Sequence, residues 1–488
     1  MRIGLADALA NAGRGAEAAR EYLGAQDEGD PAQALEMHER AARQFLISGH
    51  VDDGLRSLRM VLGAIGLRYP ATPRRALLSL LFRRALLWLR GLRFKARDAS
   101  AIPSGDLRRL DLLWSATIGL GMVDTVRGAH MHARYLLSAL RVGEPSRVAR
   151  ALAAEAAHLA ALGPSARRRS TRVLAIADRI VRGQADPYGA GFVTLIRGMI
   201  AFCDDRLRES VDLCRRADDI LRDHCIGVWW ERDTAQSIQL TSLYHLGELV
   251  ELHRVLPPLL SDAQQRGDRY ALTTALGSNI RPFLQLAHDE PERARQELAE
   301  LLGQWSQQGF HHQHSSGMYR QVEIELYAGD VSAADELASM LWTAFTGSLL
   351  IRRVYLRIIV RHVCARAALA AARTADPSAC LGRAESHVRR LQREKTVRSE
   401  ALARLVGAGI AFARRDRRLA ERLMHVAAEQ LDAIEMRLYA AATRRRLGQL
   451  LGGDQGRGMI VQADVWMTGQ GIKNPARMTA MLVPGFPD

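Results

Sequence analysis

The stretch Leu5–Leu23, LADALANAGRGAEAAREYL, contains two short segments with helical spacing on either side of the turn Gly13-Arg14-Gly15. Glycine accepts the backbone conformations that such turns need, and the flanking small residues let two helices approach closely. Similar turn signals recur between helical stretches, at Gly49, Gly143, Asp204, Gly247, Asp289, Gly329, Asp376 and Asp416. A fixed interval of about 40 residues is typical of a chain that stacks pairs of antiparallel helices.

Amphipathic stripes support the same interpretation. Apolar or small side chains recur at helical spacing between Leu207 and Leu221, and similar stripes follow Pro291, Asp330 and Asp416. Alternating apolar and polar residues, which would indicate strands, do not extend over a useful length. We therefore predict an all-α fold, an α-solenoid of tetratricopeptide-like helix-turn-helix repeats with a period of about 40 residues.

The pattern divides the chain into four parts. We predict N-terminal helical repeats, then longer irregular helical pairs, then a regular tetratricopeptide-like solenoid, and finally a capping tail, over residues 1–66, 67–143, 144–451 and 452–488. In the second part, helices are expected at roughly 74–95 and 105–123.

The last part is rich in glycine and proline. It predicts one short helix around 459–470, a second near 475–482 and a frayed end, because the terminal repeats of a solenoid cap the stack. The run from Gly452 to Gly458 lacks the lysine, the hydroxyl residue and the preceding strand of a phosphate-binding loop. We interpret this run as a flexible linker.

Length and composition describe a folded protein with more than one core. The 488 residues exceed the ~250–300 that a single hydrophobic core organises, and 48% hydrophobic with 25% charged residues is an ordinary balance. No signal-peptide pattern or uncharged membrane-spanning run occurs, which predicts a cytoplasmic location. The five widely spaced cysteines favour buried free thiols over a zinc site or a disulfide framework.

The formal net charge of +15 raises the question of nucleic acid. Only Lys95, Lys395 and Lys473 among the 68 basic residues are lysines, and the rest are arginines. Such a ratio, together with much alanine and leucine, is what a GC-rich genome produces in any protein. We therefore expect the charge to affect non-specific binding and expect no specific nucleic-acid partner.

Catalytic and cofactor-binding motifs are absent from the sequence. Phosphate-binding, kinase and Gly-x-Ser-x-Gly signatures do not occur. The dense cluster His311-His312-Gln313-His314 lacks the partners of a metal site, and we interpret it as a polar inter-helix loop. We predict a non-enzymatic protein without a cofactor. An enzyme would need a site whose carboxylates or histidines converge only in the fold.

One basic feature lies on the helix expected over 74–97. Five arginines fall on one side of that helix at 100° per residue, namely Arg75, Arg83, Arg90, Arg93 and Arg97. They could form a docking stripe for an acidic partner, nucleic acid or an anionic membrane surface. We favour the simpler interpretation that an unusually apolar helix keeps its charges on its only wet face.

A second basic feature has Arg353, Arg357 and Arg361 at i, i+4 and i+8 of an apolar helix. This helix is predicted to be central to the solenoid, and its arginines are candidates for a positive ridge on the concave surface. Periodicity alone does not show which side faces inward.

Five blocks of sequence carry a resemblance to a known family: Leu5–Leu23, Ala41–Leu67, Leu89–Phe94, Leu107–Ala129 and Gly469–Phe486. Through them the chain resembles the C-terminal region of bacterial serine/threonine protein kinases in which a kinase domain precedes an AAA-type (STAND-like) ATPase and a long tetratricopeptide-like solenoid. The blocks are helix surfaces and turns without catalytic residues. The kinase and ATPase motifs of that family have no counterpart in this chain, so neither activity is expected here.

The resemblance implies a regulatory or scaffolding arm that binds a protein partner, a kinase or ATPase signalling component, along its helical groove. Because Met1 falls almost at the start of a repeat pair, we expect a clipped gene, a late start codon or a free-standing paralogue of that arm. The alternative is the arm of a STAND-type transcriptional regulator associated with nucleic acid, although residues after 452 offer too little for a helix-turn-helix module. A steep salt dependence together with a sequence preference would indicate true nucleic-acid binding.

Overall fold

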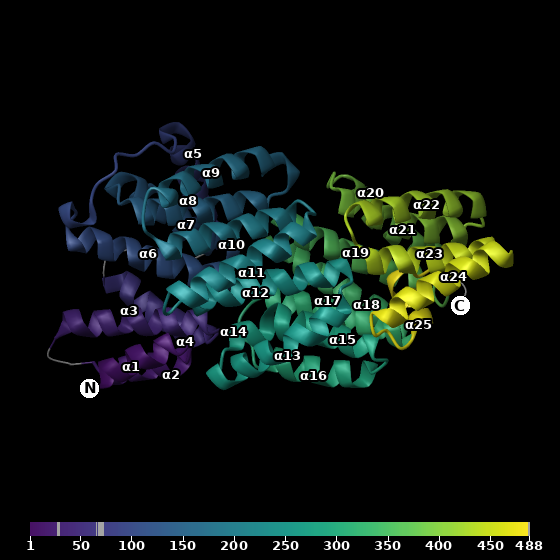
Figure 1. The fold of residues 1–488 in the computed structure, drawn as a ribbon, viewed down its shortest axis with the longest axis horizontal. Helices are drawn as coiled ribbons and strands as arrows, with labels where there is room; N and C mark the ends of the chain where they lie inside the picture. The colour runs from purple at the N-terminus through teal and green to yellow at the C-terminus, as the bar shows by residue number, and fades with distance from the viewer. Residues whose placement is uncertain (27–29, 65, 67–72, 487–488) are drawn as a thin grey trace.

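The helical spacing of the sequence produces a wholly helical architecture. The computed structural model describes residues 1–26, 30–64, 66 and 73–486, and every regular element in those ranges is a helix. The predicted all-α class is therefore confirmed. Figure 1 shows the helices arranged along one long axis, with the N-terminus at one end and the C-terminus near the other.

The helices of the N-terminal half are α1 (Arg2–Asn11), α2 (Gly15–Gly24), α3 (Pro31–Ile47), α4 (Val51–Ala64), α5 (Pro73–Arg90), α6 (Ser104–Val123), α7 (Thr125–Val142), α8 (Pro145–Ala160), α9 (Arg167–Arg182), α10 (Pro187–Cys203), α11 (Leu207–His224) and α12 (Trp229–Leu246). Those of the C-terminal half are α13 (Leu249–Arg266), α14 (Arg269–Ala271), α15 (Arg281–Ala287), α16 (Pro291–Gly303), α17 (His312–Ala328), α18 (Val331–Gly347), α19 (Val354–Ala371), α20 (Pro377–Gln392), α21 (Val397–Ala413), α22 (Arg417–Ala433), α23 (Arg437–Leu451), α24 (Gly453–Gly469) and α25 (Pro475–Leu482). Four further elements, η1–η4, are short 3-10 or π segments at Ala99–Ala101, Pro164–Ala166, Leu272–Ile280 and Leu349–Arg352.

The turn signals lie at helix ends for identifiable reasons. Gly143 and Gly329 adopt φ values of 85° and 87°, a left-handed conformation that costs other residues energy and that ends α7 and α17. The next helices begin at caps such as Asp30, whose side chain accepts hydrogen bonds from the backbone N–H groups of Ala32 and Gln33.

Neighbouring helices pack in pairs, such as α10 with α11, α21 with α22 and α6 with α7. This arrangement is consistent with an α-solenoid. Buried alanines and glycines allow the close approach within pairs. A Cβ at Gly198 of α10, for example, would lie only 2.7 Å from the Cys214 sulfur of α11.

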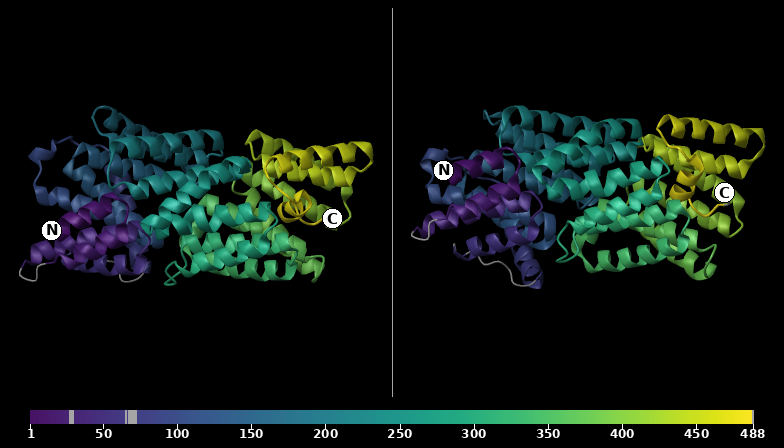
Figure 2. Two further views of the ribbon diagram at one scale, coloured as in Figure 1. Left: turned by 60° about the horizontal axis from the view of Figure 1, so that its bottom comes forward. Right: turned by 90° about the horizontal axis from the view of Figure 1, so that it is seen from below.

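The array also closes on itself over long sequence distances. Trp229 Nε1 donates to the carbonyl of Asn11, 218 residues away, and Ser306 Oγ donates to Asp52, 254 residues away. Further on, the backbone N–H of Val354 donates to the carbonyl of Ala161. Consequently α1–α4 lie beside the segment formed by α12, α13 and α14, as Figures 1 and 2 show. Helix pairs therefore contact not only their sequence neighbours but also pairs from a distant stretch of the chain.

The C-terminal region differs from the prediction in two respects. Residues from Gly453 form the first turn of α24, so the glycine-rich run is not a flexible linker. The end of the described chain is not frayed either, because Val483 and Phe486 are buried. Their apolar side chains pack into the core formed by the preceding helices, which outweighs the flexibility that glycine and proline suggest. The helix expected near 475–482 is confirmed.

Candidate interaction surfaces

Helix α5 follows the favoured prediction only in part, because Arg75 and Arg90 are exposed but Arg83 is partly buried. Arg84 points inward and its Nη1 donates to both carboxylate oxygens of Glu155 on α8, at 2.6 and 2.5 Å. Arg83 is also partly buried, and burial lowers the pKa of its guanidinium. The expectation that the charges of the predicted stripe occupy the wet face is therefore wrong for Arg83, and Arg84, which is not part of that stripe, also points inward. The inward orientation of Arg84 follows from Glu155, a buried acid 71 residues away, which helical spacing cannot reveal.

The outward face of α5 is apolar. Six large side chains are between 41% and 74% exposed, namely Leu78, Leu81, Phe82, Leu86, Trp88 and Leu89. At 100° per residue they cover one continuous side of the helix. Sequence reasoning missed this surface because α5 has apolar residues on both sides. The spacing of Leu78, Phe82 and Leu89 was the available signal.

The other predicted arginines of this region do not continue one stripe. Helix α5 ends at Arg90, so Arg93 and Arg97 lie in the segment after it. Arg90 holds that segment in place, since Nη1 donates to the carbonyl of Arg93 and Nη2 donates to that of Leu140, both at 3.0 Å. Arg97 donates to the carbonyl of Ala101 at 2.8 Å. Arg75, Arg93 and Arg97 are exposed.

The arginines of the second predicted set, Arg353, Arg357 and Arg361, lie in three different environments. Arg357 forms an ion pair with Glu394 of the segment after α20 and also donates to the carbonyl of Ile351 at 2.7 Å. Arg361 is only 5% exposed and lies 4.6 Å from the ring centroid of Trp342, and burial lowers its pKa to about 10. Arg353 faces a cavity. The three arginines therefore do not form a common positive ridge.

The cavity beside Arg353 has a volume of about 430 Å³ and lies between the start of α7, the start of α17 and the end of α18. His311 and His312 also line it. His311 accepts a hydrogen bond from Trp305 Nε1 at 3.0 Å, and burial lowers the pKa of both histidines to about 4. The histidine cluster is therefore a largely buried helix start and not a polar loop.

A buried ionic cluster lies next to α19. Glu323 of α17 accepts hydrogen bonds from Arg320 and Arg366, and all three residues are fully buried. The two guanidinium groups lower the pKa of Glu323 against the effect of burial. Tyr319 donates to the same carboxylate at 2.9 Å. The cluster ties α17 to α19 at the centre of the C-terminal half.

The same helices hold the chain's C-terminal segment, residues 472–486. Helix α25 packs against α17 and α23, and Met478, Met481 and Leu482 are at most 1% exposed. The backbone of the segment is bound by arginines of the surrounding helices. Arg366 donates to the carbonyl of Met481 at 3.1 Å, and Arg446 donates to that of Val483 at 3.2 Å.

We call the site that holds residues 472–486 the inner groove. A close approach between two backbones also shapes this groove. A Cβ at Gly409 of α21 would lie 2.8 Å from the carbonyl oxygen of Pro484, so only glycine leaves room for the segment. The ring of Phe486 lies 5.0 Å from that of Phe412. At the other end, Arg477 forms an ion pair with Asp289 at 2.7 Å. The helical spacing around Gly409 gives no sign of its contact with residues 472–486.

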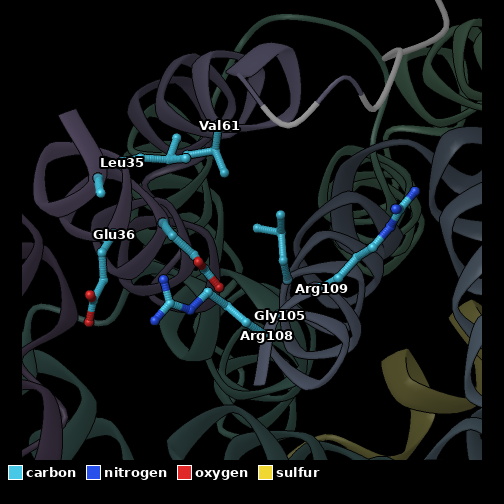
Figure 3. Close-up of a pocket in the computed structure, with 9 residues that line it drawn as sticks. Leu35, Glu36, Val61, Gly105, Arg108 and Arg109 are labelled. Carbon is cyan, nitrogen blue, oxygen red and sulfur yellow. The ribbon is translucent and has the colours of Figure 1, made fainter. Parts of the chain in front are cut away.

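An open pocket of about 230 Å³ lies between α3, α4 and α6. Figure 3 shows Leu35 and Val61 on one side of it and Arg108 and Arg109 on the other. Glu39 also lines the pocket, and burial raises the pKa of its carboxyl to about 7. Apolar and charged side chains therefore line the pocket together.

The described residues contain no group of three or more histidine, cysteine, aspartate or glutamate side chains able to hold a metal ion. Among the described helices, none has the length and apolar character needed to cross a bilayer. The described cysteines are all free, and burial raises the pKa of the Cys203, Cys214 and Cys364 thiols to about 12.

Comparison with known proteins adds no family. No protein-family model matches the sequence, and no curated protein matches it.

Proposed function

We propose that the chain is a non-enzymatic, tetratricopeptide-like interaction solenoid that binds a segment of a protein partner against its inner helices. The supporting observation is how the chain holds its own residues 472–486. Arg366 and Arg446 donate to main-chain carbonyls, which every peptide possesses, while Phe412 and the neighbouring apolar core receive the side chains. A groove that binds a backbone in this way suits a peptide or short helix from another protein.

The partner we propose is a kinase or ATPase component of a bacterial serine/threonine kinase signalling system in the cytoplasm. The support is the resemblance of the five sequence blocks, the last of which, Gly469–Phe486, includes the segment that occupies the groove. The chain would then act as a regulatory arm, and its own C-terminal segment would compete with the partner for the inner helices.

The experiment is an affinity purification from lysate of the host, nuclease-treated and at moderate salt, with partners identified by mass spectrometry. Wild type is compared with Phe486→Ala, which weakens the internal occupant, and with Val465→Ser, a change of an exposed side chain on α24. We expect one signalling protein to be retained through the washes and to be enriched by Phe486→Ala alone. Recovery of only ribosomal and nucleoid proteins that wash off with salt would refute the specific-partner proposal.

A direct binding measurement complements the purification. A labelled peptide of residues 472–486 should bind the Phe486→Ala chain and bind wild type much more weakly, since the wild-type groove is occupied. Equal binding to both chains would show that the peptide binds elsewhere. Salt titration against duplex DNA separates the alternative, a nucleic-acid regulator, because arginine-rich surfaces lose affinity with salt but show no sequence preference.

A further inference from the structure

The apolar face of α5 is the most concentrated exposed apolar surface in the described part of the chain. Phe82, Trp88 and Leu89 are 69%, 74% and 73% exposed, and Leu78, Leu81 and Leu86 lie on the same side of the helix. Elsewhere, large exposed apolar side chains are scattered, as with Ile226 and Met340, and scattered examples are normal. A contiguous face of this kind indicates a surface that something covers.

The charge carried by α5 itself and by the residues that directly follow it is of one sign. The sequence contains no aspartate or glutamate between Asp53 and Asp98. Exposed basic residues lie at both ends of α5 and in the segment after it, namely Arg75, Arg90, Arg93, Lys95 and Arg97. Beneath the helix, burial and the charges of Arg83 and Arg134 lower the pKa of His130 to about 4, and these two guanidinium groups add to the positive charge near α5. The surface is therefore complementary to an anionic occupant.

The shape of the surface favours a flat occupant. Figure 1 shows α5 at the outer edge of the molecule, and α5 packs against α7 on its inner side. A single helix that protrudes in this way presents a convex surface. Such a surface fits a deformable occupant better than it fits a concave groove formed by other helices of the same protein. Trp88 and Leu89 next to Arg90 and Arg93 also match the arrangement of interfacial helices, in which aromatic and basic residues lie at the headgroup level.

We propose that α5 is a membrane-docking helix that inserts its apolar face into the headgroup region of an anionic lipid bilayer. Leu78, Phe82 and Trp88 would enter the acyl boundary, while Arg93 and Lys95 contact lipid phosphates. Arg84 stays paired with Glu155 and keeps the helix oriented. This docking is independent of the inner groove, so a membrane-bound chain could still hold a partner segment.

The test is co-sedimentation of the full chain with vesicles of phosphatidylcholine mixed with phosphatidylglycerol, compared with vesicles of phosphatidylcholine alone. We expect binding to the anionic vesicles and little to the neutral ones. Phe82→Ser with Leu89→Ser should abolish binding, whereas the matched pair Val461→Ser with Val465→Ser on α24, both exposed, should leave it unchanged. Each loss of a positive charge, in Arg93→Gln and Lys95→Gln, should weaken binding about fivefold at low salt.

Two further readouts make the proposal falsifiable. The emission of Trp88 should shift to the blue on vesicle addition, and this change should be missing in Trp88→Phe. Light scattering determines the mass of the chain without lipid. Failure to bind anionic vesicles would overturn the proposal, as would a dimer that Phe82→Ser with Leu89→Ser dissociates, because the face would then be covered by a second copy. Retention of a protein partner through the same face, without vesicle binding, would also overturn it.

Discussion

Helices α5 and α19 are both 18 residues long, both are rich in aliphatic residues and both contain several arginines at helical spacing. Their surroundings are opposite. Every residue of α19 from Val360 to Ala371 is buried, whereas α5 is covered on one side only. In α19 the arginines find partners within the core, and in α5 two arginines turn inward and leave apolar side chains in water. The environment of an apolar helix therefore depends on how many neighbours enclose it, which its own pattern does not reveal.

The largest difference between α5 and α19 is expected when Glu323, the buried acid that pairs with Arg366 of α19, is removed. Glu323→Ala leaves the buried guanidinium groups of Arg320 and Arg366 without their carboxylate. Loss of one partner from a buried ionic cluster costs about 3–5 kcal/mol. Chemical denaturation should show a free energy of unfolding lower by that amount. Glu400→Gln, which removes a partly exposed partner of Arg404, is the control and should cost less than about 1 kcal/mol. Equal losses would contradict the buried position of α19.

The same substitution on each helix compares their environments directly. Val363→Ser in α19 removes apolar contacts at a fully buried position and introduces a hydroxyl there, which should cost about 2–3 kcal/mol. Leu81→Ser in α5 changes a side chain that is 55% exposed, and its effect should stay within about 0.5 kcal/mol. Thermal and urea unfolding measure both. A large loss for Leu81→Ser would mean that the face of α5 is covered in the free protein.

A pair of glycines in α21 tests the contact of α19 with the C-terminal segment. A Cβ at Gly409 would lie 2.5 Å from a side-chain carbon of Leu369 and 2.8 Å from the Pro484 carbonyl oxygen, so Gly409→Ala should cost about 1–3 kcal/mol. A Cβ at Gly407 meets only Leu423 at 3.6 Å, so Gly407→Ala should raise stability by up to about 1 kcal/mol. Limited proteolysis should cleave the C-terminal segment faster in the first variant alone.

Acid should act on the packing beneath α5. Burial and the charges of Arg83 and Arg134 lower the pKa of His130 to about 4 in the folded chain, below its ordinary value of 6.5. As the pH falls, His130 is protonated in the unfolded chain before it is protonated in the folded chain. The free energy of unfolding that neutral His130 contributes is therefore present at pH 7 and is lost as the pH falls from 6.5 towards 4. Replacing this residue by His130→Gln should flatten part of that dependence in unfolding measured against pH. An unchanged slope would show that His130 is protonated equally in both states.

The sequence was sufficient for the helices and for many of their ends. Turn glycines such as Gly143 and capped starts such as Asp30-Pro31 act locally, and local conformational preference decides them. The orientation of α5 and the docking of residues 472–486 depend on Glu155, Arg366 and Gly409, which lie far away in the chain. Helical periodicity says which residues share a face and says nothing about what that face meets.

The hydrogen bonds between distant parts of the chain affect when the fold can be completed during synthesis. In an ordinary repeat protein each unit can fold on its neighbour as soon as it is made. Here the carbonyl of Asn11 cannot accept its hydrogen bond from Trp229 until that residue, 218 positions later in the chain, has been synthesised. At a synthesis rate of 5–20 residues per second, the first helices would remain without this contact for about 10–45 s on the ribosome. During that interval the nascent N-terminal helices expose the surface that later meets α12.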